Sequence, residues 1–432
     1  MRSYGIRICA LAAAFGAAAF ASSAFAAKEL KVGVIYDYTG PLAAGGSKAA
    51  AIATKIAIDM INEKGGVDGY KIVPIYADAQ SNNDVAINEA TRLIDEQHVD
   101  MLMGFFSSAQ CVPIAQKADA QKKFTWYNVC IASSVFKGKN LQYVFRAQLH
   151  SDQIGEAACT FVKDIAQPRL HKAAKDVRVA IIHEDGPYGS GVAAGNVEAC
   201  AKDGMKIVLK EGYSATAPDL SPLITELRRA RPDVILHTGY NPDITLFWRQ
   251  AREQGLKWDA LIGQGAGYGQ YDKLHASFGD EANYIFDVDP AAAQLLDAKS
   301  LKPGLGELTQ EMVKRYKAAT GADEVPPHAS MGFNQAWIFF TDVLPRAIKK
   351  YGGITSDDLR KAALDSDIPV GGTIQGYGVK FFPPGTAMSG QNERSSPVVM
   401  QYLGGKTKIV WPAALRTAEP VIPLPKSSAY AK

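Results

Sequence analysis

Short apolar segments alternate with longer amphipathic segments along most of this chain, and this alternation constrains the fold more than any other feature. A short apolar run predicts a buried strand, and an apolar stripe repeating every three to four residues predicts a helix. The first series predicts strands at 30–36, 70–76, 101–105 and 124–128, and helices at 49–63, 83–98 and 112–121. Strands that alternate with helices of this length predict a parallel sheet with helices on both faces.

The same alternation starts again after Arg146. This second series predicts helices at 153–165, 191–203, 220–230 and 244–254, and strands at 177–183, 207–209, 234–237 and 260–263. Because 432 residues exceed what one hydrophobic core usually holds, we expect two α/β lobes, each with a doubly wound parallel sheet.

The C-terminal part departs from this alternation. It predicts helices at 308–319 and 336–350, and strands at 398–403 and 408–411. Beyond Gly371 the chain is rich in glycine and proline. We expect this last part to be a small addition to the second lobe.

The N-terminus has the pattern of a targeting segment. Arg2 and Arg7 accompany an alanine-rich apolar run over 8–21, and small residues then surround a cleavage site at Ala26. This pattern predicts a signal peptide over residues 1–26 and a mature, periplasmic chain that begins at Ala27. A membrane anchor is the alternative, but the run is short for a span and rich in alanine.

The charge of the mature chain is nearly balanced. Losing two of the 47 Lys and Arg residues against 44 Asp and Glu leaves about one net positive charge. A nucleic-acid partner would need clustered positive charge, so we expect none.

Four cysteines follow the signal segment: Cys111, Cys130, Cys159 and Cys200. An even number in an oxidising compartment predicts disulfides, although free buried thiols are an alternative. Of the three possible pairings we favour Cys111 with Cys130 and Cys159 with Cys200, because each pair then stays within one lobe. The spacing with histidine does not suit a metal ion, so no zinc site is expected.

Candidate binding residues follow the strands of the first lobe. Ligands of open parallel sheets bind at the carboxyl ends of strands. Phe106, Ser107 and Ser108 lie between a strand and a helix, where free amides and hydroxyls suit a carboxylate. Ala132 and Ser133 follow the next strand and offer the same chemistry. The alternative is that these serines only cap helices.

The second lobe supplies three more candidates. Tyr188 follows a strand and can cover a ligand or pack its turn. Asp243 is placed to accept from an ammonium group, or to stabilise a helix N-terminus. Tyr268, in a glycine-rich turn, is a further candidate wall.

The sequence lacks the motifs of common enzymes. It has no phosphate-binding P-loop, no nucleophile elbow and no dinucleotide fingerprint, and its seven histidines are scattered. We therefore expect neither catalysis nor a cofactor.

Two stretches carry a family resemblance. The opening Tyr38-Thr39-Gly40-Pro41-Leu42-Ala43 leads into Ile61-Asn62-Glu63-Lys64-Gly65-Gly66-Val67-Asp68-Gly69. Together they resemble the periplasmic branched-chain amino-acid-binding proteins of ABC importers, the leucine/isoleucine/valine-binding type. Gly239-Tyr240-Asn241-Pro242-Asp243 fits the same family, and the resemblance covers nearly all of the mature chain.

The resemblance implies a type I periplasmic binding protein with two lobes joined by three crossovers. We place these near Arg146, Asp289 and Asp365. Lobe 1 is then 27–146 and 290–365, and lobe 2 is 147–289 and 366–432.

The resemblance also implies roles for the candidate residues. The loops of Ser107/Ser108 and Ala132/Ser133 would hold a ligand carboxylate, while Tyr188 and Asp243 close from lobe 2, with Asp243 on the α-ammonium. One departure is Gly45, which stands where relatives carry an aromatic wall.

The expected function is therefore capture of a small amino acid or related carboxylate by hinge closure, as a monomer that serves a membrane permease. An aromatic acid, or an amide or urea-like solute, is the alternative ligand. An exported α/β enzyme and a sensory binding protein are the less favoured alternatives.

Overall fold

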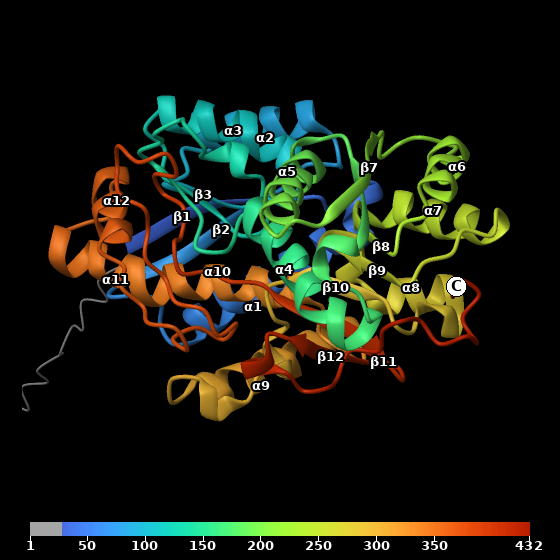
Figure 1. The fold of residues 1–432 in the computed structure, drawn as a ribbon. Coiled ribbons are helices and arrows are strands. Elements are labelled where there is room, and N and C mark those ends of the chain that lie inside the picture. Colours follow the sequence, from blue (N-terminus) through green and yellow to red (C-terminus); the bar gives the residue numbers. More distant parts are fainter. Residues whose placement is uncertain (1–27) are drawn as a thin grey trace, which may run out of the picture.

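The computed structural model describes residues 28–432, and Figure 1 shows their arrangement. Two α/β lobes lie side by side, the first on the left of the view and the second on the right. The predicted signal peptide and the expected mature start at Ala27 lie outside the described residues.

The first sheet has five strands in the order β2-β1-β3-β4-β5, and every pairing is parallel. Its strands are β1 (Lys28–Tyr36), β2 (Tyr70–Asp78), β3 (Met101–Gly104), β4 (Thr125–Tyr127) and β5 (Val144–Phe145). β3 is the central strand and all four of its residues are buried, and β1 beside it has Val32, Val34 and Ile35 fully buried. β1 runs beside β2 along its whole length, from Lys28 opposite Tyr70 to Tyr36 opposite Asp78.

The helices between these strands begin and end where local chemistry requires. They are α1 (Lys48–Glu63), α2 (Asn83–Asp95) and α3 (Ser108–Ala120). Asn82 starts α2, since its side chain accepts from the amides of Asp84 and Val85. Gly66 turns the chain after α1 at φ 83°, where a methyl group would lie 2.1 Å from the Tyr70 carbonyl oxygen, so only glycine fits.

The second sheet repeats the strand order of the first and extends it. Its order is β12-β11-β10-β9-β8-β6-β7, in which β6 to β10 are parallel and β11 and β12 are antiparallel additions. The strands are β6 (Arg178–Glu184), β7 (Lys206–Tyr213), β8 (Val234–Thr238), β9 (Ala260–Gly263), β10 (Phe286–Asp289), β11 (Val398–Leu403) and β12 (Lys406–Trp411). The helices are α4 (Ser151–Leu170), α5 (Pro187–Lys202), α6 (Ser221–Ala230), α7 (Asn241–Glu253) and α8 (Tyr271–Phe278). The predicted pair of doubly wound lobes is confirmed.

The helices after β10 return to the first lobe. They are α9 (Leu305–Thr320), α10 (Pro327–Ile338), α11 (Leu344–Arg346) and α12 (Ser356–Leu364). α10 packs closely on α1, because Gly332 has no side chain to separate them: a methyl group there would lie 2.2 Å from the Ala50 carbonyl oxygen. The Trp126 indole of β4 donates to the Gln335 carbonyl, which fixes α10 beside the sheet.

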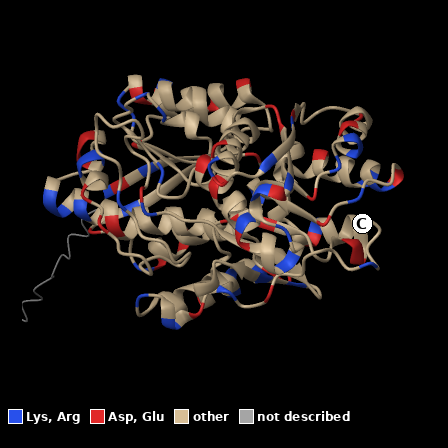
Figure 2. Ribbon diagram, viewed as in Figure 1, with Lys and Arg blue, Asp and Glu red and all other residues tan. Residues whose placement is uncertain are grey.

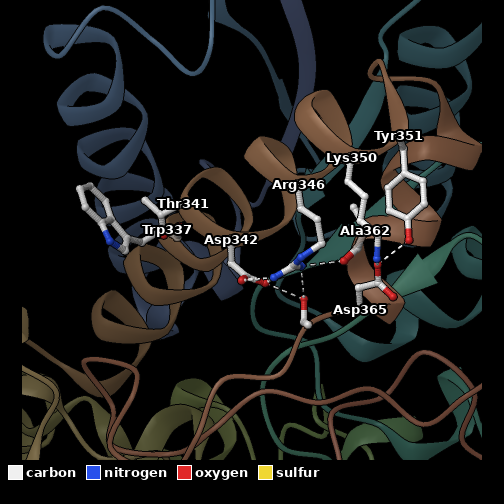
Figure 3. Close-up of polar contacts among 9 residues, drawn as sticks. Trp337, Thr341, Asp342, Arg346, Lys350, Tyr351, Ala362 and Asp365 are labelled. Carbon is white, nitrogen blue, oxygen red and sulfur yellow. Dashed lines mark hydrogen bonds and ion pairs between the residues drawn. The ribbon is translucent and has the colours of Figure 1, made fainter.

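Figure 3 shows how α12 is held against the long helical segment that contains α11. The Arg346 guanidinium donates to Asp342 and, at 2.8 Å, to the carbonyl of Ala362. Lys350 and Tyr351 both donate to Asp365, just after α12. These contacts make α12 part of the first lobe.

The chain beyond α12 also stays with the first lobe for some distance. Ile374, Val379 and Phe381 belong to the apolar core that contains β1 and α10. The Asn392 amide donates to the Arg146 carbonyl, beside the first crossover. We therefore propose that the third crossover lies between Asn392 and Val398 rather than near Asp365, because only β11 and β12 join the second sheet.

Both favoured cysteine pairs form disulfides. Cys111 of α3 is joined to Cys130 in the loop after β4, and Cys159 of α4 is joined to Cys200 of α5. Charged residues of both signs are interspersed along the outer helices (Figure 2). Within residues 28–432, no helix combines the length and apolar character that crossing a bilayer requires.

Candidate functional site

A narrow pocket lies between the lobes at the carboxyl ends of their strands. Loops after β3 and β4 reach it from the first lobe, and loops after β6, β8, β9 and β10 reach it from the second. Its walls combine apolar side chains with a few polar groups, and the lining residues are Phe106, Ser108, Val129, Ile131, Tyr188, Tyr240, Gly265, Ala266, Asp289, His328 and Met331. This is where ligands bind in open α/β sheets.

Ser108 supplies the polar group of the first lobe. It is the first residue of α3, so its backbone amide and that of Ala109 have no carbonyl within the helix to bind. Its Oγ accepts from the Ala132 amide at 3.1 Å, which leaves the hydroxyl hydrogen available to a ligand. Unpaired amides with partial positive charge and a hydroxyl donor form a suitable site for a carboxylate.

Phe106 and His328 form one wall of the pocket. Their ring centres are 5.4 Å apart, and a methyl group on Gly46 would lie 3.0 Å from both side chains. The His328 Nδ1 accepts from the Gln270 side-chain amide of the second lobe at 3.1 Å. Burial lowers the pKa of His328 to about 4, so this ring is neutral at physiological pH.

Tyr188 and Tyr240 form the opposite wall. Their ring centres are 5.3 Å apart, and the Tyr188 hydroxyl donates to the Gln264 carbonyl, which fixes the ring. Phe106 lies 6.3 Å from Tyr240 across the cleft. Burial raises the pKa of Tyr240 well above its usual range, and the nearby Ser107 hydroxyl opposes this shift, so Ser107 lies close to the second lobe. The two lobes are therefore in contact around the pocket.

Asp289 is the acidic group of the lining. It ends β10 and is only 2% exposed, and its Oδ2 has no hydrogen-bond partner among the described residues. Burial and the neighbouring charge of Asp287 raise the pKa of Asp289 well above its usual range. A buried acceptor without a partner is costly unless a ligand supplies one.

Asp243 and Tyr268 lie outside this lining, in a buried chain of hydrogen bonds. The Trp248 indole donates to the Tyr268 hydroxyl at 3.2 Å, and that hydroxyl lies 2.6 Å from His237 Nδ1. His237 Nε2 lies 2.7 Å from the Tyr213 hydroxyl, which donates to Asp243 Oδ2, also at 2.7 Å. Asp243 Oδ1 accepts from the Tyr240 amide, so both carboxylate oxygens are already bonded. The ammonium role of Asp243 stays a prediction, with no pocket contact in its favour.

Ser133 also lies outside the lining of the pocket. Its hydroxyl donates to Asp152 at 2.7 Å and lies 2.9 Å from the Ser151 hydroxyl, both in the first turn of α4. Ser133 thus connects the first lobe to the start of the second, close to the first crossover. The amide of its neighbour Ala132 is used by Ser108.

Three predicted residues, Phe106, Ser108 and Tyr188, lie together in the lining, and Ser107 and Ala132 lie beside them. Sequence reasoning missed Asp289 because β10 was not expected. Its sequence, Phe286-Asp287-Val288-Asp289, alternates apolar and acidic residues, which is the pattern of a strand with one polar face. His328 and Met331 come from α10, whose position against the first sheet had no local signal.

The chemistry of the site is that of binding. The lining offers apolar walls, a helix N-terminus with a hydroxyl, and a buried carboxyl group. No set of histidine, cysteine or acidic side chains within residues 28–432 is arranged to hold a metal ion.

Comparison with known proteins identifies the family. Residues 29–388 match the periplasmic binding protein family. A Leu/Ile/Val-binding protein homolog 7 from Brucella suis is 33% identical over 398 residues, which cover 92% of this chain and 95% of that protein. A homolog 8 from Brucella abortus is also 33% identical, over 385 residues, 89% of this chain and 91% of that protein.

Solved structures share the fold at lower identity. The leucine-binding protein LivK of Thermotoga maritima superposes with a TM-score of 0.72 at 20% identity, covering 88% of this chain and 97% of its own. A solute-binding protein of R. palustris in complex with benzoate gives 0.70 at 18% identity, covering 88% and 95%. The family match and the full-length relatives show that this chain belongs to the periplasmic binding protein family.

Proposed function

We propose that this chain is exported to the periplasm, captures a small amino acid or related carboxylate between its lobes, and delivers it to the permease of an ABC importer. The observation that carries this proposal is the lining of the pocket between the lobes. Ser108 and the α3 N-terminus offer donors for a carboxylate, and Tyr188, Tyr240 and Phe106 offer apolar walls. The full-length Brucella relatives, named as Leu/Ile/Val-binding homologs, support the same solute class.

The two lobes lie close together around the pocket. The cavity between them encloses about 30 Å³, about the space of one water molecule, so an entering solute must part the lobes before they close on it.

Hinge closure gives the mechanism of capture. A solute that touches both lobes stabilises the closed arrangement, because only a difference in affinity between two states shifts their equilibrium. Here Ser108 and Phe106 come from the first lobe, and Tyr188 and Asp289 come from the second. The closed surface is then what a permease recognises.

Calorimetric titration with a panel of solutes tests this proposal. The panel contains the aliphatic and aromatic amino acids, benzoate and its hydroxylated forms, and short amides. We expect dissociation constants of about micromolar for at least one carboxylate solute. Absence of binding by every carboxylate in the panel would refute the proposal.

An aromatic acid is the second candidate ligand. The three aromatic rings of the lining favour it, and a solved relative is a complex with benzoate. In the same titrations this candidate predicts that benzoate binds more tightly than any aliphatic amino acid.

Turnover of a bound solute, measured by chromatography, would instead indicate an enzyme.

A further inference from the structure

Two carboxyl groups of β10 converge beside the pocket. Asp287 and Asp289 are two residues apart on one strand, so their side chains lie on the same face of the sheet. A methyl group on Gly269 would lie 3.1 Å from Asp287 Oδ2 and 3.5 Å from Asp289 Oδ2. Both oxygens are buried and lack a hydrogen-bond partner in the part of the chain that the structure describes.

Asp289 is part of the pocket lining, whereas Asp287 lies next to Asp289 and outside the lining. Asp287 uses Oδ1 to accept from the Gly265 amide at 2.9 Å, whereas Asp289 lines the pocket. A methyl group on Gly265 would lie 3.7 Å from Asp289 Oδ1 and 3.2 Å from the Tyr188 hydroxyl. Asp289 is thus placed to meet a solute beside Tyr188.

The surroundings give this carboxyl pair no cation. The pocket lining, as described over residues 28–432, contains no lysine or arginine. The titratable groups that face the pair from α5, the 266–269 turn, α8 and α10 are Tyr188, Tyr268, Tyr271 and His328. None of them carries positive charge at physiological pH, since a tyrosine cannot become a cation and burial lowers the pKa of His328 to about 4.

We propose that Asp289, supported by Asp287, is the residue that recognises a protonated amine on the solute. This inference rests on the proposed function and narrows it to solutes that carry both a carboxylate and an amine. The carboxylate lies at Ser108 and the α3 N-terminus in the first lobe, and the ammonium lies at Asp289 in the second. An acid that lacks the amine leaves Asp289 without a partner, so it binds more weakly.

Capture by this pair also releases a proton. Burial raises the pKa of both carboxyl groups, and the charge of Asp287 adds to the shift at Asp289, so we expect the empty pair to hold a proton at neutral pH. When an ammonium group arrives, the carboxyl O–H bond breaks, the proton passes to the buffer, and the ammonium N–H groups donate to the carboxylates. The charge of the solute replaces the charge of the proton.

Calorimetry with paired probes tests the inference. The pairs are leucine with 4-methylpentanoate, and phenylalanine with 3-phenylpropanoate, each differing only by the amine. For the wild-type chain we expect the amino acid of a pair to bind about 100-fold more tightly than its amine-free partner. Titration at about pH 7 in buffers of different ionisation enthalpy should show about one proton released per solute bound.

Variants assign the effect to Asp289. Asp289→Asn should lose about 100-fold in affinity for the amino acid, lose discrimination within each pair and release no proton. Asp272→Asn removes an exposed carboxyl of the same lobe and should behave as the wild type. Asp243→Asn tests the rival acid, and loss of discrimination there instead of at Asp289 would overturn the inference.

If Asp289→Asn does not fold, the titrations of the wild-type chain still test the inference. An amine-free acid that binds as tightly as its amino acid, or binding without proton release, would overturn it while a carboxylate-binding function stands. Absence of binding by all four probes and by the wider panel would refute both proposals.

Discussion

At the scale of single residues, neighbouring groups decide which polar atoms a solute can use. Ser108 and Ser133 follow adjacent strands, yet only Ser108 keeps a hydroxyl hydrogen for the pocket, because Ser133 bonds to Asp152. Asp243 and Asp289 are both buried acids, yet both oxygens of Asp243 already have donors. A polar side chain can bind a solute only if its hydrogen-bonding atoms are not already used within the protein. Residue type alone therefore does not distinguish the binding residues from the structural ones.

Replacing Ser108 with alanine tests this distinction. Ser108→Ala removes the donor for the solute carboxylate and leaves the Ala132 amide without its acceptor, so we expect affinity to fall about 10- to 100-fold. Titration calorimetry measures the change. Ser190→Ala, which removes an exposed hydroxyl of α5, is the matched control and should bind normally. Equal affinities of the two variants would contradict the role of Ser108.

At the scale of elements, one disulfide fixes the two loops that form the first half of the pocket. Cys111 lies in the first turn of α3, three residues after Ser108. Cys130 lies between Val129 and Ile131, which both line the pocket. Their bond therefore holds α3 and the loop after β4 in one arrangement, whereas the Cys159–Cys200 bond joins two helices of the second lobe.

The two disulfides should therefore differ in their effects on binding. Replacing either pair with alanine is expected to lower the free energy of unfolding by about 2–4 kcal/mol. Only Cys111→Ala/Cys130→Ala should also weaken solute binding, by about 10-fold, because it frees the pocket loops. Calorimetry and urea unfolding on both double variants check this. Equal loss of affinity in the two would show that Cys111–Cys130 has no special role in the pocket.

Local sequence patterns predict where helices and strands lie better than they predict which of them pack or hydrogen-bond together. The two βα series, the strand ends that carry Phe106, Ser108 and Tyr188, and the late strand at 398–403 all follow from local pattern. Asp289 was missed because two aspartates interrupt the apolar pattern of β10. His328 was missed because α10 reaches the pocket only through its packing on α1, which no local pattern records. The availability of Ser133 and Asp243 likewise depends on long-range hydrogen bonds.

At the scale of the whole molecule, the two lobes meet around the pocket. Gln270 of the second lobe donates to His328 of the first, and a methyl group on Gly45 would lie 3.7 Å from Asn241. Around these contacts lie buried acids with raised pKa values and buried histidines with lowered pKa values. These two sets have opposite effects on the pH dependence of stability.

The signs follow from proton binding. Burial raises the pKa of Asp243 to about 7, so the folded chain holds more protons than the unfolded one between about pH 4 and 7, and this contribution weakens as pH rises. Burial lowers the pKa of His237 to about 3 and of His150 and His328 to about 4. The contribution of these buried, neutral histidines to the free energy of unfolding is lost as pH falls below about 6.5, because the unfolded chain then takes up protons that the folded chain does not.

We therefore expect the free energy of unfolding to vary by less than about 2 kcal/mol between pH 4.5 and 6.5. It should fall below about pH 4, where His237 still responds and where acids with a lowered pKa, such as Asp233 and Asp365, lose their stabilising charge. Urea unfolding across this range provides the measurement. A steady change of more than about 4 kcal/mol between pH 4.5 and 6.5 would contradict the opposition of the two sets.

The most direct test of capture between two lobes is a crystal structure with the tightest-binding solute of the panel. We expect one solute in the pocket at the strand ends, touching Ser108 and Phe106 on one lobe and Tyr188 and Asp289 on the other. A solute that contacts a single lobe, or that lies on another surface, would contradict it.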